Sequence, residues 1–127
     1  MAALLPDTNV LIRFLRGQRE YVELFHSILA EDHLLASCPI TVAEVFAGMK
    51  TREEPVTRRL LESLHYFVIT PEVAESAGRL RSEWNRRGRT LSLADTLIAA
   101  TAIHYGCTLV TQNVKDFPMP GLRLLAV

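Results

Sequence analysis

The sequence contains little cysteine and no grouping of residues that would hold zinc. Only two cysteines occur among 127 residues, Cys38 and Cys107, and neither belongs to a CxxC or Cys/His pattern. The four histidines also lack the spacing of metal ligands. Zinc sites depend on such spacings, and disulfides belong mainly to oxidising compartments. We therefore expect two buried free thiols and no zinc site.

Long apolar runs are also missing. The most apolar stretch, LSLADTLIAATA at 91–102, is interrupted by Asp95 and is shorter than the ~20 apolar residues that a membrane-spanning helix needs. The first residues, MAALLP, have no basic residue before their short apolar run, so a secretory signal is not expected. These features predict a cytoplasmic protein that does not associate with a membrane.

The chain has no net charge, because 14 basic residues balance 14 acidic ones. This balance argues against a strongly basic nucleic-acid-binding protein. If four acids were gathered in one metal-binding pocket, however, the remaining surface would carry a net charge of +4. Hydrophobic residues make up 49% of the chain and charged residues 22%, as in an ordinary globular domain.

Strand-like and helix-like segments alternate along the chain. Such alternation predicts an α/β fold with a central parallel sheet of four to five strands and helices on both faces, built as one domain over residues 1–127. Parallel sheets of this kind bind ligands at the carboxyl ends of their strands. The expected strands are 4–7, 33–40, 66–70, 108–111 and 122–127, and the expected helices are 8–17, 19–31, 41–50, 55–65, 71–88 and 92–106.

Acidic residues from separate segments fall at this edge of the predicted sheet. Asp7 follows the first strand, and Glu44 and Asp95 are expected in the first turns of two helices. Asn113 and Asp116 follow the fourth strand. Carboxylates brought together there would repel one another unless a cation compensated them. Carboxylate and amide oxygens suit Mg²⁺ or Mn²⁺, which would support hydrolysis of phosphate esters.

Each acid also has an ordinary structural explanation. Thr41 with Glu44, and Ser92 with Asp95, fit the [ST]-x-x-[DE] pattern of a helix capping box. Asp7 alone could form an Asx-turn after its strand. Capping does not explain, however, why acids from unrelated segments fall at the same edge of the sheet. We therefore favour the metal-site interpretation.

Four sequence blocks together resemble the PIN-domain ribonucleases, and within them the VapC-type toxins of toxin–antitoxin pairs. The resemblance implies a three-layer α/β/α domain and an Mg²⁺- or Mn²⁺-dependent endoribonuclease. It extends over nearly the whole chain, in the order of the family. The blocks are PDTNVLI at 6–12, TVAEV at 41–45, SLADTLIAATA at 92–102 and LVTQNVKDF at 109–117.

The resemblance carries the family's catalytic acids onto particular residues. Asp7, Glu44 and Asp95 match the three core acids, and Asp7 and Asp95 are expected to be the primary metal ligands. The fourth acid is Asp116, because the chain has the N-x-x-D form in which Asn113 occupies the place of an acid found in other members. Asn113 is expected to be a polar contact.

Further residues are assigned supporting roles. Asn9 and Thr111 match polar positions that hold the acids in place. Arg86, Arg87 and Arg89 precede the helix of Asp95, and we expect them to contact the RNA backbone. The resemblance and the acidic set together imply in-line attack by a metal-activated water that leaves a 5′-phosphate and a 3′-hydroxyl.

The resemblance also implies partners: a homodimer and a small antitoxin whose tail enters the acidic groove. Two other functions remain open at this point. One is a catalytically inactive PIN-like module that binds RNA or protein. The other is a phosphatase similar to the haloacid dehalogenase type, which requires a second Asp where this chain has Asn9.

Overall fold

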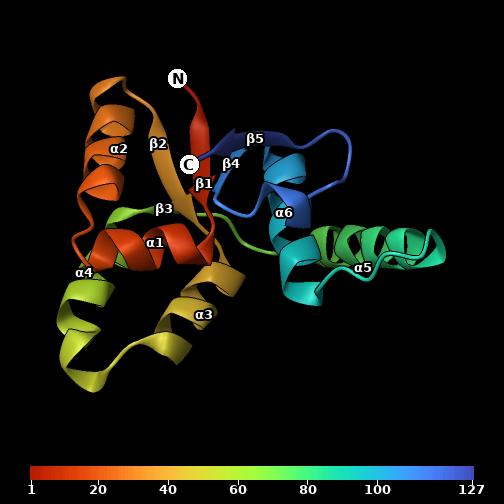
Figure 1. Cartoon of the computed structure of the whole chain (residues 1–127), viewed down its shortest axis with the longest axis horizontal. Helices are drawn as coiled ribbons and strands as arrows, with labels where there is room; N and C mark the ends of the chain where they lie inside the picture. The colour runs from red at the N-terminus through yellow and green to blue at the C-terminus, as the bar shows by residue number, and fades with distance from the viewer.

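The computed structural model describes residues 1–127, in which helices cover both faces of a sheet (Figure 1). Apart from β1, each strand is preceded by a helix or a short helical turn. The elements are β1 (Ala3–Pro6), α1 (Thr8–Leu15), α2 (Arg19–Ala30), β2 (Leu34–Ser37), α3 (Pro39–Gly48), η1 (Thr51–Glu53), α4 (Glu54–Ser63), β3 (His65–Tyr66), α5 (Pro71–Arg86), α6 (Leu93–Tyr105), β4 (Thr108–Thr111), η2 (Val114–Asp116) and β5 (Arg123–Ala126).

The five strands form an all-parallel sheet in the order β3-β2-β1-β4-β5. From β1 the chain winds outward through β2 to β3, and then returns to the other side of β1 with β4 and β5. The winding direction therefore reverses between β1 and β4, where a parallel sheet binds its ligands. Both the predicted fold class and the parallel sheet are confirmed.

Alternate residues of β1 face the two helical layers. Leu4 belongs to the apolar core under α1–α4, which includes Phe25 of α2 and Val45 of α3. Leu5 points to the opposite core, which includes Ile98 of α6. Figure 1 shows α1–α4 on one side of the sheet and α5 and α6 on the other. Burying each large aliphatic or aromatic side chain contributes about 1.5–3 kcal/mol to the stability of the fold. The two cores therefore hold the carboxyl edge of the sheet in place.

The helix after β2 begins two residues earlier than the sequence pattern suggested. Pro39 occupies its first position, and Cys38 rather than Thr41 is the N-cap. A proline at the first helical position loses no intrahelical hydrogen bond and already has a helical φ. The Thr41 hydroxyl closes this first turn by accepting a hydrogen bond from Cys38 N at 3.1 Å.

The predicted strand at 66–70 was also placed incorrectly. The paired strand β3 contains only His65 and Tyr66, whose partners lie in β2. The next residues lead into α5, where the Thr70 hydroxyl caps the helix by accepting from Val73 N. The β-branched residues that suggested a strand therefore serve partly as a connection to a helix.

Both cysteines are free and buried, as expected. Burial raises the pKa of the Cys107 thiol to about 11, so this thiol stays protonated near neutral pH. No helix in the fold combines the length and the apolar character needed to span a bilayer.

Candidate active site

Asp7 lies at the point where β1 ends and α1 begins, next to the reversal of the sheet. It is the N-cap of α1, and only 7% of its surface is exposed. Its Oδ1 accepts a hydrogen bond from Thr8 N at 2.8 Å, and its Oδ2 accepts from the Thr111 hydroxyl at 3.1 Å. Asp7 therefore has the capping role expected of an ordinary helix start. In addition, β4 fixes its second oxygen.

Glu44 comes to the same place from α3. Because α3 begins at Pro39, Glu44 lies in its second turn and cannot close a capping box with Thr41. The capping explanation for Glu44 was therefore wrong. Its Oε1 instead accepts a hydrogen bond from the Thr8 hydroxyl at 2.6 Å, although its side chain is exposed.

Asp95 is the third residue of α6 and is half-buried. The helix starts as predicted, with Ser92 as N-cap and its hydroxyl oxygen accepting from Asp95 N at 3.0 Å. Here the capping explanation holds for the backbone of Asp95. Its carboxylate does not close a capping box with the Ser92 amide.

The electrostatics of the site couple the acids to one another. Burial raises the pKa of Asp7, and hydrogen bonds from Thr8 and Thr111 oppose this rise. The negative charges of Asp95 and Glu44 raise the pKa of Asp7 further.

The pKa of Asp95 shifts in the same direction. Burial is the largest cause, the Ser92 side chain acts against it, and the charges of Asp116 and Glu44 add to it. The charge effects among these acids require them to lie near enough to interact through poorly hydrated protein. Asp7 at the start of α1 and the acids of α3, α6 and η2 thus form one electrostatic group.

These acids do not form a ready-made cage for a metal ion. No group of three or more His, Cys, Asp or Glu side chains is arranged so that it could hold a metal by itself. Mg²⁺ is usually held by one or two carboxylates and keeps several waters, which leaves room for substrate phosphate. The donor set at this edge consists of carboxylate oxygens and contains no histidine or thiolate, so it fits such an ion.

The residues predicted to support the acids differ in their placement. Thr111 contacts Asp7 directly, and its hydroxyl also accepts from Asn113 N at 3.0 Å. Asn113 thus supports the site through its backbone rather than its amide group. Asp116 ends the short helix η2 and is half-buried. Asn9 is exposed on α1, and its side chain hydrogen-bonds none of the acids.

The arginines predicted to contact RNA have partners within the protein. Arg86 donates to Ser82, and Arg87 pairs with Glu83 at 2.9 Å. Arg89 donates to the carbonyl oxygen of Lys115, one residue before Asp116.

The segment after α5 turns back along that helix, because Arg81 donates to Leu91 O at 2.9 Å. The start of α6 therefore lies beside the middle of α5, and Arg86 and Arg87 lie beyond it. The contact from Arg89 connects this returning segment to the loop of Asp116. The role of all three arginines in RNA binding stays a prediction.

Thr8 was not predicted as a site residue, although its amide and hydroxyl bind two different acids of the site. The available signal was its position directly after Asp7 in the PDTNVLI block. An N1 residue with a hydroxyl is common, however, and the partner in α3 becomes visible only when the two helices are placed.

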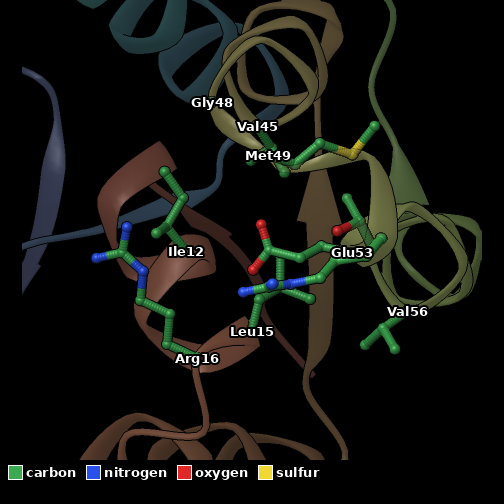
Figure 2. A pocket seen from close by; sticks show the side chains of 10 residues that line it. Ile12, Leu15, Arg16, Val45, Gly48, Met49, Glu53 and Val56 are labelled. Carbon is green, nitrogen blue, oxygen red and sulfur yellow. The ribbon is translucent and has the colours of Figure 1, made fainter.

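An apolar pocket of about 320 Å³ lies between α1, α3, η1 and α4. Figure 2 shows Ile12 and Leu15 of α1 on one side and Val45 and Met49 of α3 on another, with Val56 of α4 closing it. Val45 follows Glu44 directly, so α3 carries both a lining residue of the pocket and one of the four acids.

Two cations stand at the rim of this pocket. Arg16 and Arg52 line it and form no ion pair with any carboxylate of the chain. The one acid in the lining, Glu53, accepts a hydrogen bond from Lys50 N at 2.7 Å. The rim therefore suits a partner that carries both apolar and acidic side chains.

The profile of the PIN domain matches residues 4–118, which is nearly the whole chain and includes all four acids. The chain belongs to the PIN-domain family. Within this family it is of the VapC type: it is 36% identical to "Ribonuclease VapC10" of Mycobacterium tuberculosis over 116 residues, covering 91% of this chain and 86% of the relative. It is also 29% identical to "Ribonuclease VapC19" of the same species over 120 residues, covering 94% and 96%.

Solved structures that resemble this chain include toxin–antitoxin complexes. The VapBC2 complex of Rickettsia felis, bound to a promoter DNA fragment, contains a chain that superposes with a TM-score of 0.87 at 25% identity and 98% coverage of both chains. A toxin–antitoxin complex from Klebsiella pneumoniae gives a TM-score of 0.79 at 34% identity, covering 97% of this chain and 96% of the other.

Proposed function

We propose that this protein is an endoribonuclease toxin that requires Mg²⁺ or Mn²⁺ and is inhibited by a small antitoxin. The observation that carries the proposal is that Asp7 and Asp95 lie poorly hydrated at the switch point of the sheet, where burial raises the pKa of each and the charges of neighbouring acids raise it further. A protein without a cation to bind gains nothing from this repulsion. The names of its relatives support RNA as the substrate.

Asp7 and Asp95 are the residues that would hold the ion. When bound, such an ion supplies a water of lowered pKa and neutralises charge that develops on the phosphate. Glu44 has one oxygen fixed by Thr8, and its other oxygen has no partner within the chain, so it can accept a hydrogen bond from the attacking water. Asp116 completes the acidic group, and Thr111 keeps Asp7 in its orientation.

Cleavage of RNA is expected with Mn²⁺ or Mg²⁺ and is expected to stop in EDTA. The measurement is gel analysis of a structured RNA incubated with purified protein under each condition, followed by mapping of the product ends. A 5′-phosphate and a 3′-hydroxyl are expected, because a water attacks in line. Products with a 2′,3′-cyclic phosphate would contradict the proposed mechanism.

Two other results would point to the alternative functions. RNA binding without cleavage in any metal would favour an inactive binding module. Release of phosphate from small monoesters, with the RNA left intact, would favour a phosphatase.

We further propose that the apolar pocket between α1 and α3 is where the antitoxin docks. The solved neighbours are toxin–antitoxin complexes, which supports a protein partner for this chain. Because α3 contributes Val45 to the pocket and Glu44 to the acidic group, a segment seated in the pocket would contact the helix that carries Glu44. The unpaired Arg16 and Arg52 complement acidic side chains on such a segment. The proposal includes a homodimer in the cytoplasm, and light scattering of the purified protein measures the oligomeric state.

The variant Val56→Glu is expected to weaken antitoxin binding at least tenfold and to leave RNA cleavage unchanged. Val56 lines the pocket but is 50% exposed, so the substitution places a charge in the docking surface without burying it in the core. Loss of one well-packed apolar contact is worth about 1–2 kcal/mol, and the desolvated charge adds to that loss.

The binding partner for this measurement is the small protein encoded in the adjacent reading frame, and affinity is measured by calorimetry. Val68→Glu is the matched control, because Val68 is 52% exposed and lies outside the pocket. Equal affinities of the two variants for the antitoxin would place its docking surface elsewhere.

A further inference from the structure

Thr8 joins two acids that come from different parts of the chain. Its backbone N–H donates to Asp7 Oδ1 at 2.8 Å, and its hydroxyl donates to Glu44 Oε1 at 2.6 Å. The second contact spans 36 positions in the sequence, from the start of α1 to the second turn of α3. The Thr8 side chain is itself buried, with 9% of the residue exposed.

The direction of this hydrogen bond is fixed by chemistry. An ionised carboxylate only accepts hydrogen bonds, so the single hydroxyl proton of Thr8 is committed to Glu44. A distance of 2.6 Å is typical of an O–H donor on a charged oxygen, which is about twice as strong as a neutral contact. Threonine is also β-branched, so its hydroxyl is held in few orientations.

Glu44 has little else to hold it in place. Its side chain is exposed, and it takes no part in capping α3. The neighbouring charges of Asp7 and Asp95 favour its movement into water. Fixing a flexible glutamate costs side-chain entropy, which the contact with Thr8 offsets before any ligand binds.

We propose that Thr8 is a positioning residue whose hydroxyl holds Glu44 beside Asp7 and leaves Glu44 Oε2 open to the ion and its waters. This inference rests on the proposed metal-dependent function. It assigns a role to a residue outside the acidic set. Partners of metal-binding groups typically change metal affinity or activity by about 10–100-fold when removed.

The test compares Thr8→Val, which removes the hydroxyl but keeps the branched shape, with Thr8→Ser, which keeps the hydroxyl. Affinity for Mn²⁺ is measured by calorimetry without RNA, and kcat and KM are measured with RNA. Thr8→Val is expected to lower both Mn²⁺ affinity and kcat about 10–100-fold, with KM for RNA nearly unchanged. Thr8→Ser is expected to remain within about threefold of the unaltered protein.

A double-mutant cycle with Glu44→Gln keeps the test decisive if Thr8→Val is less stable. If Thr8 acts through Glu44, adding Thr8→Val to Glu44→Gln is expected to cause little further loss of Mn²⁺ affinity. Additive losses would overturn the inference. Wild-type affinity in Thr8→Val, or an equal loss in Thr8→Ser, would also overturn it. If the unaltered protein neither binds Mn²⁺ nor cleaves RNA, the proposed function is overturned as well. The outcomes for the Thr8 variants alone leave the proposed function standing.

Discussion

Replacing Asp95 by asparagine is expected to lower kcat for RNA cleavage about a thousandfold and, in EDTA, to raise the melting temperature of the protein. A thousandfold loss corresponds to about 4 kcal/mol of transition-state stabilisation, the scale expected for a lost metal-binding carboxylate. The gain in stability follows because burial and the charges of Asp116 and Glu44 disfavour the ionised form of Asp95. Asparagine has nearly the same shape and no charge.

The control for this prediction is Glu75→Gln, which makes the same change of charge on an exposed part of α5. Glu75 forms no ion pair, and its substitution is expected to leave both kcat and the melting temperature unchanged. The measurements are single-turnover cleavage and thermal unfolding in EDTA. An Asp95→Asn variant that keeps more than about a tenth of the activity, or that melts below the unaltered protein, would contradict the prediction.

The site was predictable to the extent that it depends on backbone topology. Asp7 and Asp95 directly follow or begin regular elements, so the carboxyl edge of a parallel sheet collects them wherever the rest of the chain packs. Most helix boundaries were also predictable, because the residues that cap a helix lie next to it in the sequence. Gly106 ends α6 with a positive φ of 68°, a conformation that glycine adopts readily.

Contacts that depend on how elements cross were not predictable. The Thr8–Glu44 hydrogen bond requires the relative placement of α1 and α3, which the packing of both helices in the same apolar core decides. The same holds for Arg86 and Arg87. Their nearness to Asp95 in sequence suggested nearness in space, but the segment after α5 turns back and leaves them beyond the start of α6.

The start of α3 shows how a local error changed the interpretation of a site residue. Reading Thr41 as the N-cap made Glu44 a capping acid, whereas Pro39 and Cys38 begin the helix and free its carboxylate. Two signals compete at Pro39, because a proline can end a strand and is equally suited to the first position of a helix. The correction strengthens the functional interpretation of Glu44.

The difference in melting temperature between Asp95→Asn and the unaltered protein is expected to shrink in EDTA as the pH is lowered from about 7 to about 4. Because the pKa of Asp95 is raised by folding, the folded state binds this proton more tightly than the unfolded state. The destabilisation that Asp95 causes is therefore complete above its folded pKa. It fades as the pH falls toward the ordinary value of 3.8, where a protonated Asp95 resembles asparagine.

Near neutral pH, Mn²⁺ is expected to make the unaltered protein more stable than Asp95→Asn, which is the reverse of their order in EDTA. At 100 times its Kd, a ligand that binds only the folded state adds about 2.7 kcal/mol, or roughly 10 °C in Tm for a domain of this size. The unaltered protein is expected to gain this stability and Asp95→Asn to gain little, because it lacks one of the two proposed ligands. Thermal unfolding of both proteins across pH, with Mn²⁺ and with EDTA, measures the two effects together. An equal rise in melting temperature with Mn²⁺ in both proteins would mean that the ion binds away from Asp95. A difference in melting temperature in EDTA that does not change with pH would mean that the ionised Asp95 is not destabilised by its surroundings.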